Sequence, residues 1–329
     1  MKVLVTGGAG YIGSHAVKRL LAAGHQPVVL DDYSRGHRAA VPENVPRVHA
    51  STADANAVER ALVENEIECV LHFAAFAYVG ESVEKPLEYY QNNTGGSLSL
   101  LSAMRGAGVE RLVFSSTCAT YGEPEQMPIT EETPQTPVNP YGWSKLFVEQ
   151  MLRDTARAQP SFGFTSLRYF NVAGCALDGS LGEHHDPETH IIPVILQAAL
   201  GKREKVTVFG DDYPTPDGTC IRDYIHVDDL IDAHIQAMQT TGPGTRSFYN
   251  LGIGRGYSVR EVVEAARAVV ARDFKVEIGP RRPGDPPELY SDAGKIAREL
   301  GWTAQVTDIH QIIESAWRWF REHPDGYSS

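Results

Sequence analysis

The feature that most constrains this chain is a turn near its N-terminus, where an apolar run meets a cluster of glycines. Lys2–Thr6 is rich in β-branched residues and predicts a strand. Four glycines lie between Gly7 and Gly13, and a helical pattern runs from Ile12 to Ala23. Glycine permits positive φ and close approach of the backbone to a pyrophosphate, and the free N–H groups of a helix start face an anion. Together they predict a dinucleotide-binding βαβ unit.

The end of the second expected strand, residues 27–30, indicates which dinucleotide is bound. Asp31 follows this strand directly, at a position where a carboxylate accepts a hydrogen bond from a ribose hydroxyl. Asp32 adds a second negative charge, which disfavours the 2′-phosphate of NADP by repulsion. We therefore expect NAD, and Arg35 and Arg38 keep NADP as the alternative.

Length, charge and cysteine spacing exclude several classes of protein. A chain of 329 residues suggests about two domains. Its net charge of −12 argues against a nucleic-acid groove or an anionic membrane surface as a partner. Four cysteines lie far apart without a CxxC spacing, which suits a reducing compartment and no zinc site. We see neither an apolar leader nor an apolar run of membrane length, so we expect a cytoplasmic protein.

Strand and helix patterns alternate up to Tyr169, and they predict an α/β fold with a Rossmann-type, doubly wound parallel sheet. The composition changes after Asn171, where loops become longer and the pattern reads as α+β. We expect an NAD-binding domain over residues 1–172. A smaller α+β substrate-binding domain would cover residues 173–329, with segments near 226–252 packing back on the first domain.

Histidines raise the question of a metal or of catalysis. The loop after Asn171 holds His184, His185 and His190, whose spacing matches no metal site that we can defend. We expect solvated loop histidines and no metal. His72 ends an apolar run, and a strand histidine with a hydrogen-bond partner is favoured there over a catalytic one.

The chemistry centres on Tyr141 and Lys145, which are four residues apart and so share one face of an expected helix. A free phenol has a pKa near 10, but a nearby ammonium and a positive nicotinamide ring favour the phenolate. Such a phenol can take or return a hydroxyl proton while hydride moves at the same carbon. Thr117 ends the expected strand 111–117 and can donate to the substrate oxygen or to the phenolate. The alternative is an exposed surface pair without chemistry.

Several longer runs match the motifs of one family. They are residues 5–15, 79–82, 89–93, 140–142, 167–171, 212–215 and 218–227. On these runs the chain resembles the extended short-chain dehydrogenases/reductases, and within them the UDP-glucose 4-epimerase family, over almost its whole length.

This resemblance implies tightly held NAD and the interconversion of UDP-glucose and UDP-galactose through a 4-keto sugar, a step of galactose metabolism. Tyr141 would remove the proton from the sugar 4′-hydroxyl as hydride leaves C4′, and Lys145 would also fix the cofactor ribose. Arg222 and Arg282 would clamp the diphosphate. The resemblance also implies a homodimer formed through two helices, here near residues 87–105 and 141–158.

Residue by residue, the motifs and the reasoning above give two sets of expected contacts. The cofactor contacts are Gly7, Gly10, Tyr11, Ile12, Gly13, Asp31, Asp32, Phe73, Ala74, Asn92, Tyr141, Lys145 and Tyr169. The substrate contacts are Thr117, Asn171, His190, Ile191, Thr207, Phe209, Arg222, Arg282, Asp285 and Leu289.

Departures from the family pattern leave more than one sugar as the expected substrate. Ser51 stands where relatives often carry an acid that contacts adenine, and Ala77 stands where many carry a lysine. Leu289 occupies the position of the sugar-size gate, which is a tyrosine in strict hexose enzymes, so a UDP-N-acetylhexosamine is an alternative substrate. Residues 77–80, 116–124 and 323–327 are more similar to UDP-arabinose 4-epimerases, which makes UDP-arabinose and UDP-xylose a further alternative.

Two other classes of protein are less favoured. A 4,6-dehydratase would need an Asp-Glu pair after Thr117, where Cys118 and Ala119 stand instead. A non-enzymatic NAD-binding sensor would not need Tyr141 and Lys145 as a pair.

Overall fold

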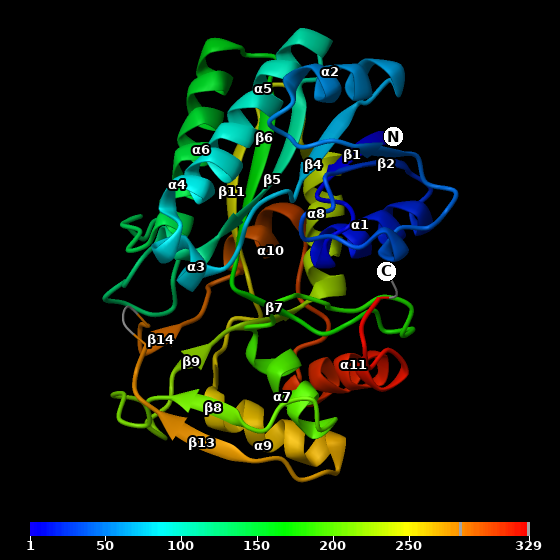
Figure 1. Ribbon diagram of the computed structural model, residues 1–329. Helices are drawn as coiled ribbons and strands as arrows, with labels where there is room; N and C mark the ends of the chain where they lie inside the picture. Colours follow the sequence, from blue (N-terminus) through cyan, green and yellow to red (C-terminus); the bar gives the residue numbers. More distant parts are fainter. Residues whose placement is uncertain (283–284, 328–329) are drawn as a thin grey trace.

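The computed structural model describes residues 1–282 and 285–327, and its centre is a seven-stranded parallel sheet (Figure 1). The strand order is β11-β6-β5-β4-β1-β2-β3, which confirms the expected Rossmann-type, doubly wound fold. The strands are β1 (Lys2–Thr6), β2 (Gln26–Asp31), β3 (Arg47–His49), β4 (Cys69–His72), β5 (Arg111–Thr117), β6 (Gly163–Tyr169) and β11 (Arg246–Leu251).

Helices cover both faces of this sheet. Helices α1 (Tyr11–Ala22) and α8 (Val227–Thr240) pack against each other on one face. The other face carries α2 (Ala55–Glu64), α5 (Gly96–Ala107) and α6 (Pro140–Ala158). Alternate residues of each strand therefore enter different buried clusters, as Val5 and Leu4 do in β1. This is why the central strands read as continuous apolar runs rather than as alternating ones.

Smaller elements form the lower half of the molecule in Figure 1, around a third buried apolar cluster. Its helices are α7 (Ile191–Ala199), α9 (Val259–Val270) and α11 (Ile309–Glu322). Its short strands are β7 (Asn171–Ala173), β8 (Val206–Phe209), β9 (Ile221–Arg222), β10 (Tyr224–His226), β12 (Tyr257–Ser258), β13 (Val276–Gly279) and β14 (Glu288–Leu289).

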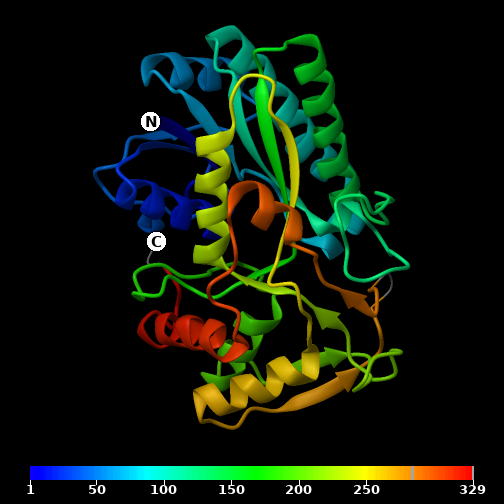
Figure 2. The ribbon, with the colours of Figure 1, turned by 180° about the vertical axis from the view of Figure 1, so that it is seen from behind.

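The chain crosses between the two halves more than once. Figure 2 shows α8 (yellow-green) and β11 (yellow) running along the central sheet, although short strands of the other half precede α8 and follow β11 in sequence. Strand β11 pairs in parallel with β6 and forms one edge of the central sheet. The expected division of the chain at residue 172 stays a prediction.

The region near residues 87–105 differs from the single helix that the sequence predicts. It consists of α4 (Pro86–Tyr89), a π-helical turn (Tyr90–Gly95) and then α5. Asn93 in the π turn is buried, where its Oδ1 accepts from Phe76 N at 2.8 Å and its Nδ2 donates to Ser144 Oγ at 3.0 Å. These long-range bonds hold the inserted turn, and helical spacing in the sequence does not reveal them.

Two short helices were not expected either, namely α3 (Val79–Glu84) and α10 (Gly294–Leu300). Within the described ranges we find no helix whose length and apolar character would carry it through a bilayer.

Candidate active site

The glycine turn after β1 is built for close backbone contact. Gly7 has a φ of +69°, a left-handed value that favours glycine. A Cβ on Gly13 would overlap the carbonyl oxygen of Gly7, so the start of α1 lies directly against the turn. Gly10 caps α1 without a side-chain hydrogen bond, which leaves the first helical N–H groups for an outside acceptor.

Asp31, the expected ribose contact, also orders this turn. Its Oδ2 accepts from Ala9 N at 2.9 Å and its Oδ1 accepts from Tyr33 N at 2.8 Å. Burial raises the pKa of the Asp31 carboxyl, although these two backbone bonds oppose the shift. Asp32 is exposed and accepts from the backbone and the hydroxyl of Ser34.

The turn after β4 completes this edge of the sheet. Ala74 N donates to Thr6 O at 3.1 Å, and a Cβ on Gly7 would lie only 2.7 Å from Ala74 N. Phe73 packs against His234 with ring centroids 4.8 Å apart. Tyr11 directs its hydroxyl to Gly174 O, so its backbone rather than its phenol is left for a cofactor. The close glycines, the free helix start and the carboxylate together fit a dinucleotide.

Tyr141 and Lys145 lie on the first turns of α6, where local sequence fixes the start of the helix. Asn139 Oδ1 accepts from Gly142 N at 2.8 Å, and Pro140 occupies the first helical position. Lys145 Nζ donates to Ser115 O of β5 at 2.8 Å. Tyr141 and Lys145 are both buried, which rules out the alternative of an exposed surface pair.

Thr117 and Tyr169 complete this group at the carboxyl ends of neighbouring strands. They are direct partners in the parallel register of β5 and β6, and Thr117 is buried. Thr117 Oγ1 accepts from Ala119 N at 3.1 Å, which closes a short turn after β5. Thr117 also lies close enough to Tyr141 to act as its hydrogen-bond partner. The structure thus brings Tyr141, Lys145 and Thr117 together.

The electrostatics of the pair differ from the sequence-based expectation. Burial lowers the pKa of Lys145 to about 7. Burial raises the pKa of the Tyr141 phenol, Tyr169 adds to that rise, and Thr117 opposes it. The protein groups alone therefore raise the Tyr141 pKa, whereas we expected Lys145 to help lower it. Desolvation of the buried phenolate outweighs the effect of the neighbouring groups, and the Lys145 ammonium points at a backbone carbonyl instead.

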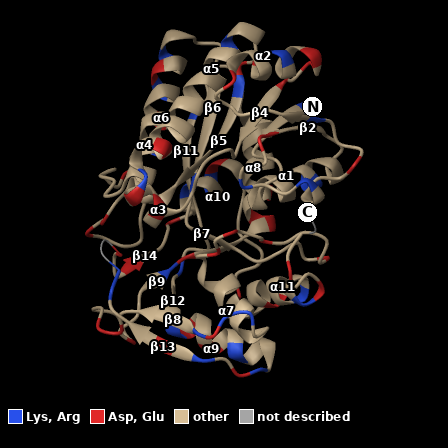
Figure 3. Ribbon diagram, viewed as in Figure 1, with Lys and Arg blue, Asp and Glu red and all other residues tan. Residues whose placement is uncertain are grey.

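A second group of expected residues meets at β8, β9 and the segment before β14. Arg222 Nη2 lies 3.5 Å from Asp285 Oδ1, and Arg282 Nε donates to Asp285 Oδ2 at 2.8 Å. The Arg282 guanidinium also lies over the Phe209 ring, 5.0 Å from its centroid. Figure 3 shows basic positions (blue) at β9 and along the segment between β13 and β14. Two guanidinium groups held by one carboxylate suit a diphosphate.

The other expected substrate residues lie on separate elements of the same half of the molecule. Thr207 lies in β8, Asn171 begins β7, His190 caps α7 and Ile191 is its first residue. Leu289 of β14 packs against a small buried cluster of Tyr121, Ile129 and Phe170.

The structure shows which groups the Asn92 and His72 side chains contact. Asn92, the expected cofactor contact, donates from Nδ2 to Asn93 Oδ1 at 3.0 Å, whereas Asn93 makes the long-range bonds described above. His72 has the structural role that the sequence favours, because its ring nitrogens contact Thr6 Oγ1 at 2.7 Å and Ser97 Oγ at 2.8 Å in the core.

A buried ion pair beneath the site was missed by sequence reasoning. Glu149 of α6 and Arg168 of β6 are almost fully buried and meet through two hydrogen bonds of 2.7 and 2.9 Å. Ser116, next to Thr117, donates to Glu149 Oε1 at 2.7 Å. The signal in the sequence was an arginine inside a strand that is otherwise uncharged.

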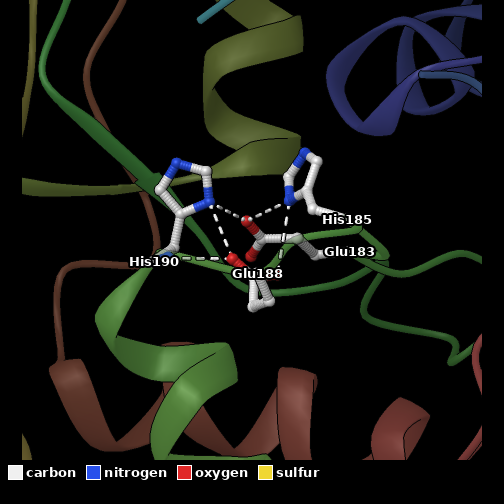
Figure 4. Close-up of side chains that lie close together, drawn as sticks. All are labelled: Glu183, His185, Glu188 and His190. Atoms are coloured by element: carbon white, nitrogen blue, oxygen red, sulfur yellow. Dashed lines mark hydrogen bonds and ion pairs between the residues drawn. The ribbon is translucent and has the colours of Figure 1, made fainter. Parts of the chain in front are cut away.

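The expectation of solvated loop histidines was wrong. His184 stacks on His37 and accepts from Tyr327 N, and the other two histidines meet carboxylates. His185 and His190 each point Nδ1 at the buried carboxylates of Glu183 and Glu188 (Figure 4). Burial lowers the histidine pKa values, but the carboxylates outweigh it and raise the pKa of His185 to about 9 and of His190 to about 10.

Comparison with known proteins identifies the family. A family model described as the NAD dependent epimerase/dehydratase family matches residues 3–252. The chain belongs to this family. It is 48% identical over 330 residues to a UDP-glucose 4-epimerase of Lacticaseibacillus casei, covering 99% of both chains. It is 47% identical over 340 residues to a probable UDP-arabinose 4-epimerase 3 of Oryza sativa, covering 99% of this chain and 84% of the rice protein.

A solved structure gives the same answer for the fold. UDP-glucose 4-epimerase from Bifidobacterium longum in complex with NAD+ and UDP matches with a TM-score of 0.95 at 42% identity, over 99% of this chain and all of that one. As a member of the NAD-dependent epimerase/dehydratase family, the chain takes NAD as its cofactor. The glycine turn, Asp31 and the turn after β4 are the residues that fit NAD.

Proposed function

We propose that this chain interconverts UDP-glucose and UDP-galactose by NAD-dependent epimerisation at C4 of the sugar. The observation that carries this proposal is the buried group of Tyr141, Thr117 and Lys145 at the carboxyl edge of the sheet. The chain aligns over nearly its whole length with UDP-glucose 4-epimerases, and the Bifidobacterium relative binds NAD+ and UDP, which supports the same ligands here.

In this proposal the phenol of Tyr141 takes the proton of the sugar 4′-hydroxyl and later returns it to the same oxygen. The glycine turn and Asp31 would hold NAD, which would supply a reversible hydride acceptor for C4 and a positive ring that would favour the phenolate, as the protein groups alone do not. Thr117 donates to the sugar oxygen or to the phenolate, which keeps the two oxygens at proton-transfer distance. Lys145, positioned by Ser115 O, holds the cofactor ribose.

The nucleotide half of the substrate is assigned to the second group of residues. Arg222 and Arg282 hold the diphosphate, with Asp285 fixing both guanidinium groups before the substrate arrives. Because these donors are already ordered, they lose less entropy on binding, and the nucleotide is held firmly. The two arginines hold the diphosphate and not the sugar, so the sugar can turn between its two orientations. The expected uridine and phosphate contacts Asn171, His190, Ile191, Thr207 and Phe209 belong to the same proposal.

A pentose substrate is the second candidate, and the rice relative supports it. The same proton and hydride transfers at C4 would serve UDP-arabinose and UDP-xylose. Leu289 is smaller than a tyrosine, so the same site would also accept a UDP-N-acetylhexosamine. Product analysis with UDP-galactose, UDP-arabinose and UDP-N-acetylgalactosamine ranks the three, and the proposal expects the highest kcat/KM with UDP-galactose.

The test of the chemistry is Tyr141→Phe, which removes the hydroxyl and keeps the ring. We expect turnover to fall by roughly 100- to 10,000-fold, with UDP affinity within threefold of the wild type. Tyr327→Phe, in the C-terminal segment, is the matched control and should keep full turnover. Loss of UDP binding together with rate would contradict the assignment of Tyr141 as the base.

The proposal includes a homodimer in the cytoplasm. Exposed apolar side chains gather on the helices expected to pair, including Leu87 (76% exposed), Leu98 (55%) and Phe147 (43%). All four cysteines are free thiols, which suits a reducing compartment. Light scattering should give twice the mass of one chain, and Leu87→Glu should lower that mass; a monomeric wild type would refute the dimer.

A further inference from the structure

A cluster of four side chains lies in the loop between β7 and α7, outside the catalytic group. Glu183, His185, Glu188 and His190 point toward one another, as Figure 4 shows. Each offers one nitrogen or oxygen atom, and these atoms all lie within 4.8 Å of one another. Two imidazole nitrogens and two carboxylate oxygens are ligands that zinc accepts in proteins.

Four nitrogen–oxygen distances in this cluster are close to the spacing between ligands of one metal ion. His185 Nδ1 lies 3.3 Å from Glu183 Oε1 and 3.3 Å from Glu188 Oε2. His190 Nδ1 lies 2.9 Å from Glu183 Oε1 and 3.2 Å from Glu188 Oε1. Ligands at about 2.0–2.1 Å from a tetrahedral zinc ion are separated from each other by about 3.3–3.4 Å.

Two of the atoms have, in the described part of the chain, no contact of hydrogen-bond geometry, although they form ion-pair contacts within the cluster. Glu183 Oε1 and His190 Nδ1 are buried and find no hydrogen-bond partner of acceptable geometry among residues 1–282 and 285–327. The Glu183 side chain is only 3% exposed, and that of Glu188 is 2% exposed. Two carboxylates taken out of water require positive charge nearby.

Backbone hydrogen bonds also hold one of the four side chains in place. Glu188 Oε1 accepts from Thr189 N at 2.7 Å and from His190 N at 2.8 Å, which fixes that carboxylate. A surface pocket lined by residues 183–188 and by the C-terminal segment reaches this loop and gives an ion a route in.

We propose that Glu183, His185, Glu188 and His190 bind one zinc ion in a structural site. Four protein ligands complete a tetrahedral sphere, so the ion has no open position and takes no part in the sugar chemistry. His190 binds the ion through Nδ1, and the substrate contact proposed above for His190 then uses Nε2. The His185 ring packs against Tyr11 at 6.1 Å and against Tyr78 at 5.9 Å, and Tyr11 belongs to the glycine turn. The ion therefore fastens this loop beside the cofactor end of the site.

Elemental analysis tests the proposal without using activity as the readout. The purified protein, incubated with excess ZnCl2 and then passed through metal-free buffer, should retain about one zinc per chain. Glu183→Gln and His190→Gln should weaken zinc binding at least about tenfold. His184→Gln is the matched control, because His184 lies in the same loop but stacks on His37 and accepts from Tyr327 N.

Cobalt provides a test that needs no variant. Addition of Co2+ to the wild type should give the intense visible absorption of a tetrahedral site, and Zn2+ should abolish it. Retention of no zinc by the wild type, or equal retention by Glu183→Gln and the wild type, would overturn the site. An octahedral cobalt spectrum would overturn the four-ligand geometry.

Discussion

Glu149→Gln is the substitution whose effect the structure determines most directly. Every group around this buried carboxylate is a hydrogen-bond donor. Its Oε1 accepts from Ser116 Oγ, Ser166 Oγ and Arg168 Nε, at 2.7, 3.1 and 2.9 Å. Its Oε2 accepts from Arg168 Nη2, Gln135 Nε2 and Arg153 Nη2, at 2.7, 3.1 and 3.4 Å. Burial raises the pKa of Glu149, but Arg168 and the other donors outweigh it, and the pKa is lowered below its usual value.

Glutamine keeps the shape of the side chain but places an NH2 group against three donors, whichever way the amide is turned. It also leaves the Arg168 guanidinium buried without its counter-charge. Breaking a buried pair in this way costs about 3–5 kcal/mol. With an unfolding entropy of about 2.1 cal/mol/K per residue, 329 residues convert that cost to a drop in Tm of about 4–7 °C.

Scanning calorimetry of the wild type and Glu149→Gln measures this shift. Glu264→Gln on α9 is the control, because its ion pair with Arg267 is exposed and should change Tm by less than about 1.5 °C. Adding Arg168→Met to Glu149→Gln should restore part of the loss, since the unpaired charge is then gone. A Tm for Glu149→Gln as close to the wild type as that of Glu264→Gln would refute the reasoning.

Three further predictions concern the substrate and pH. Arg282→Ala should weaken UDP binding about tenfold or more by calorimetry, whereas the control Arg281→Ala, which loses a bond to Asp212 instead, should not; equal affinities would remove Arg282 from the clamp. Leu289→Tyr should lower kcat/KM for UDP-N-acetylgalactosamine about tenfold or more and leave UDP-galactose nearly unchanged, and an equal effect on both sugars would show that Leu289 is no size gate. Burial lowers the pKa of His234 to about 4 in the folded state, so the unfolded chain takes up the proton first and stability falls as pH drops below 6.5. Between pH 7 and 5 the wild type should lose about 2 kcal/mol more than His234→Gln in urea unfolding, and parallel curves for the two proteins would contradict this.

The sequence by itself determined the features that depend on neighbours along the chain. The glycine turn, the central strands and the caps at Asn139 and Ser258 follow from residues a few positions apart. The four-residue spacing of Tyr141 and Lys145 places both on one helix face for the same reason. Parallel strands bring their carboxyl ends to one edge, so the meeting of Thr117 with that pair was also predictable.

Only the tertiary structure decided which distant side chains share a buried space. Glu149 of α6 meets Arg168 of β6 between the helix and the sheet, and Asn93 holds the π turn through bonds to Phe76 and Ser144. The loss of solvent around the Tyr141 phenol depends on the elements packed over it, which is why the protein groups alone raise its pKa although the spacing to Lys145 suggested a lowering.

In the loop that contains Glu183 and His190, the sequence also failed to predict which side chains meet, although these residues are close together along the chain. Its spacing in sequence matches no familiar metal motif, yet the path of the loop turns all four side chains inward. Periodicity reports on helices and strands, whereas an irregular loop takes its shape from the surfaces beneath it.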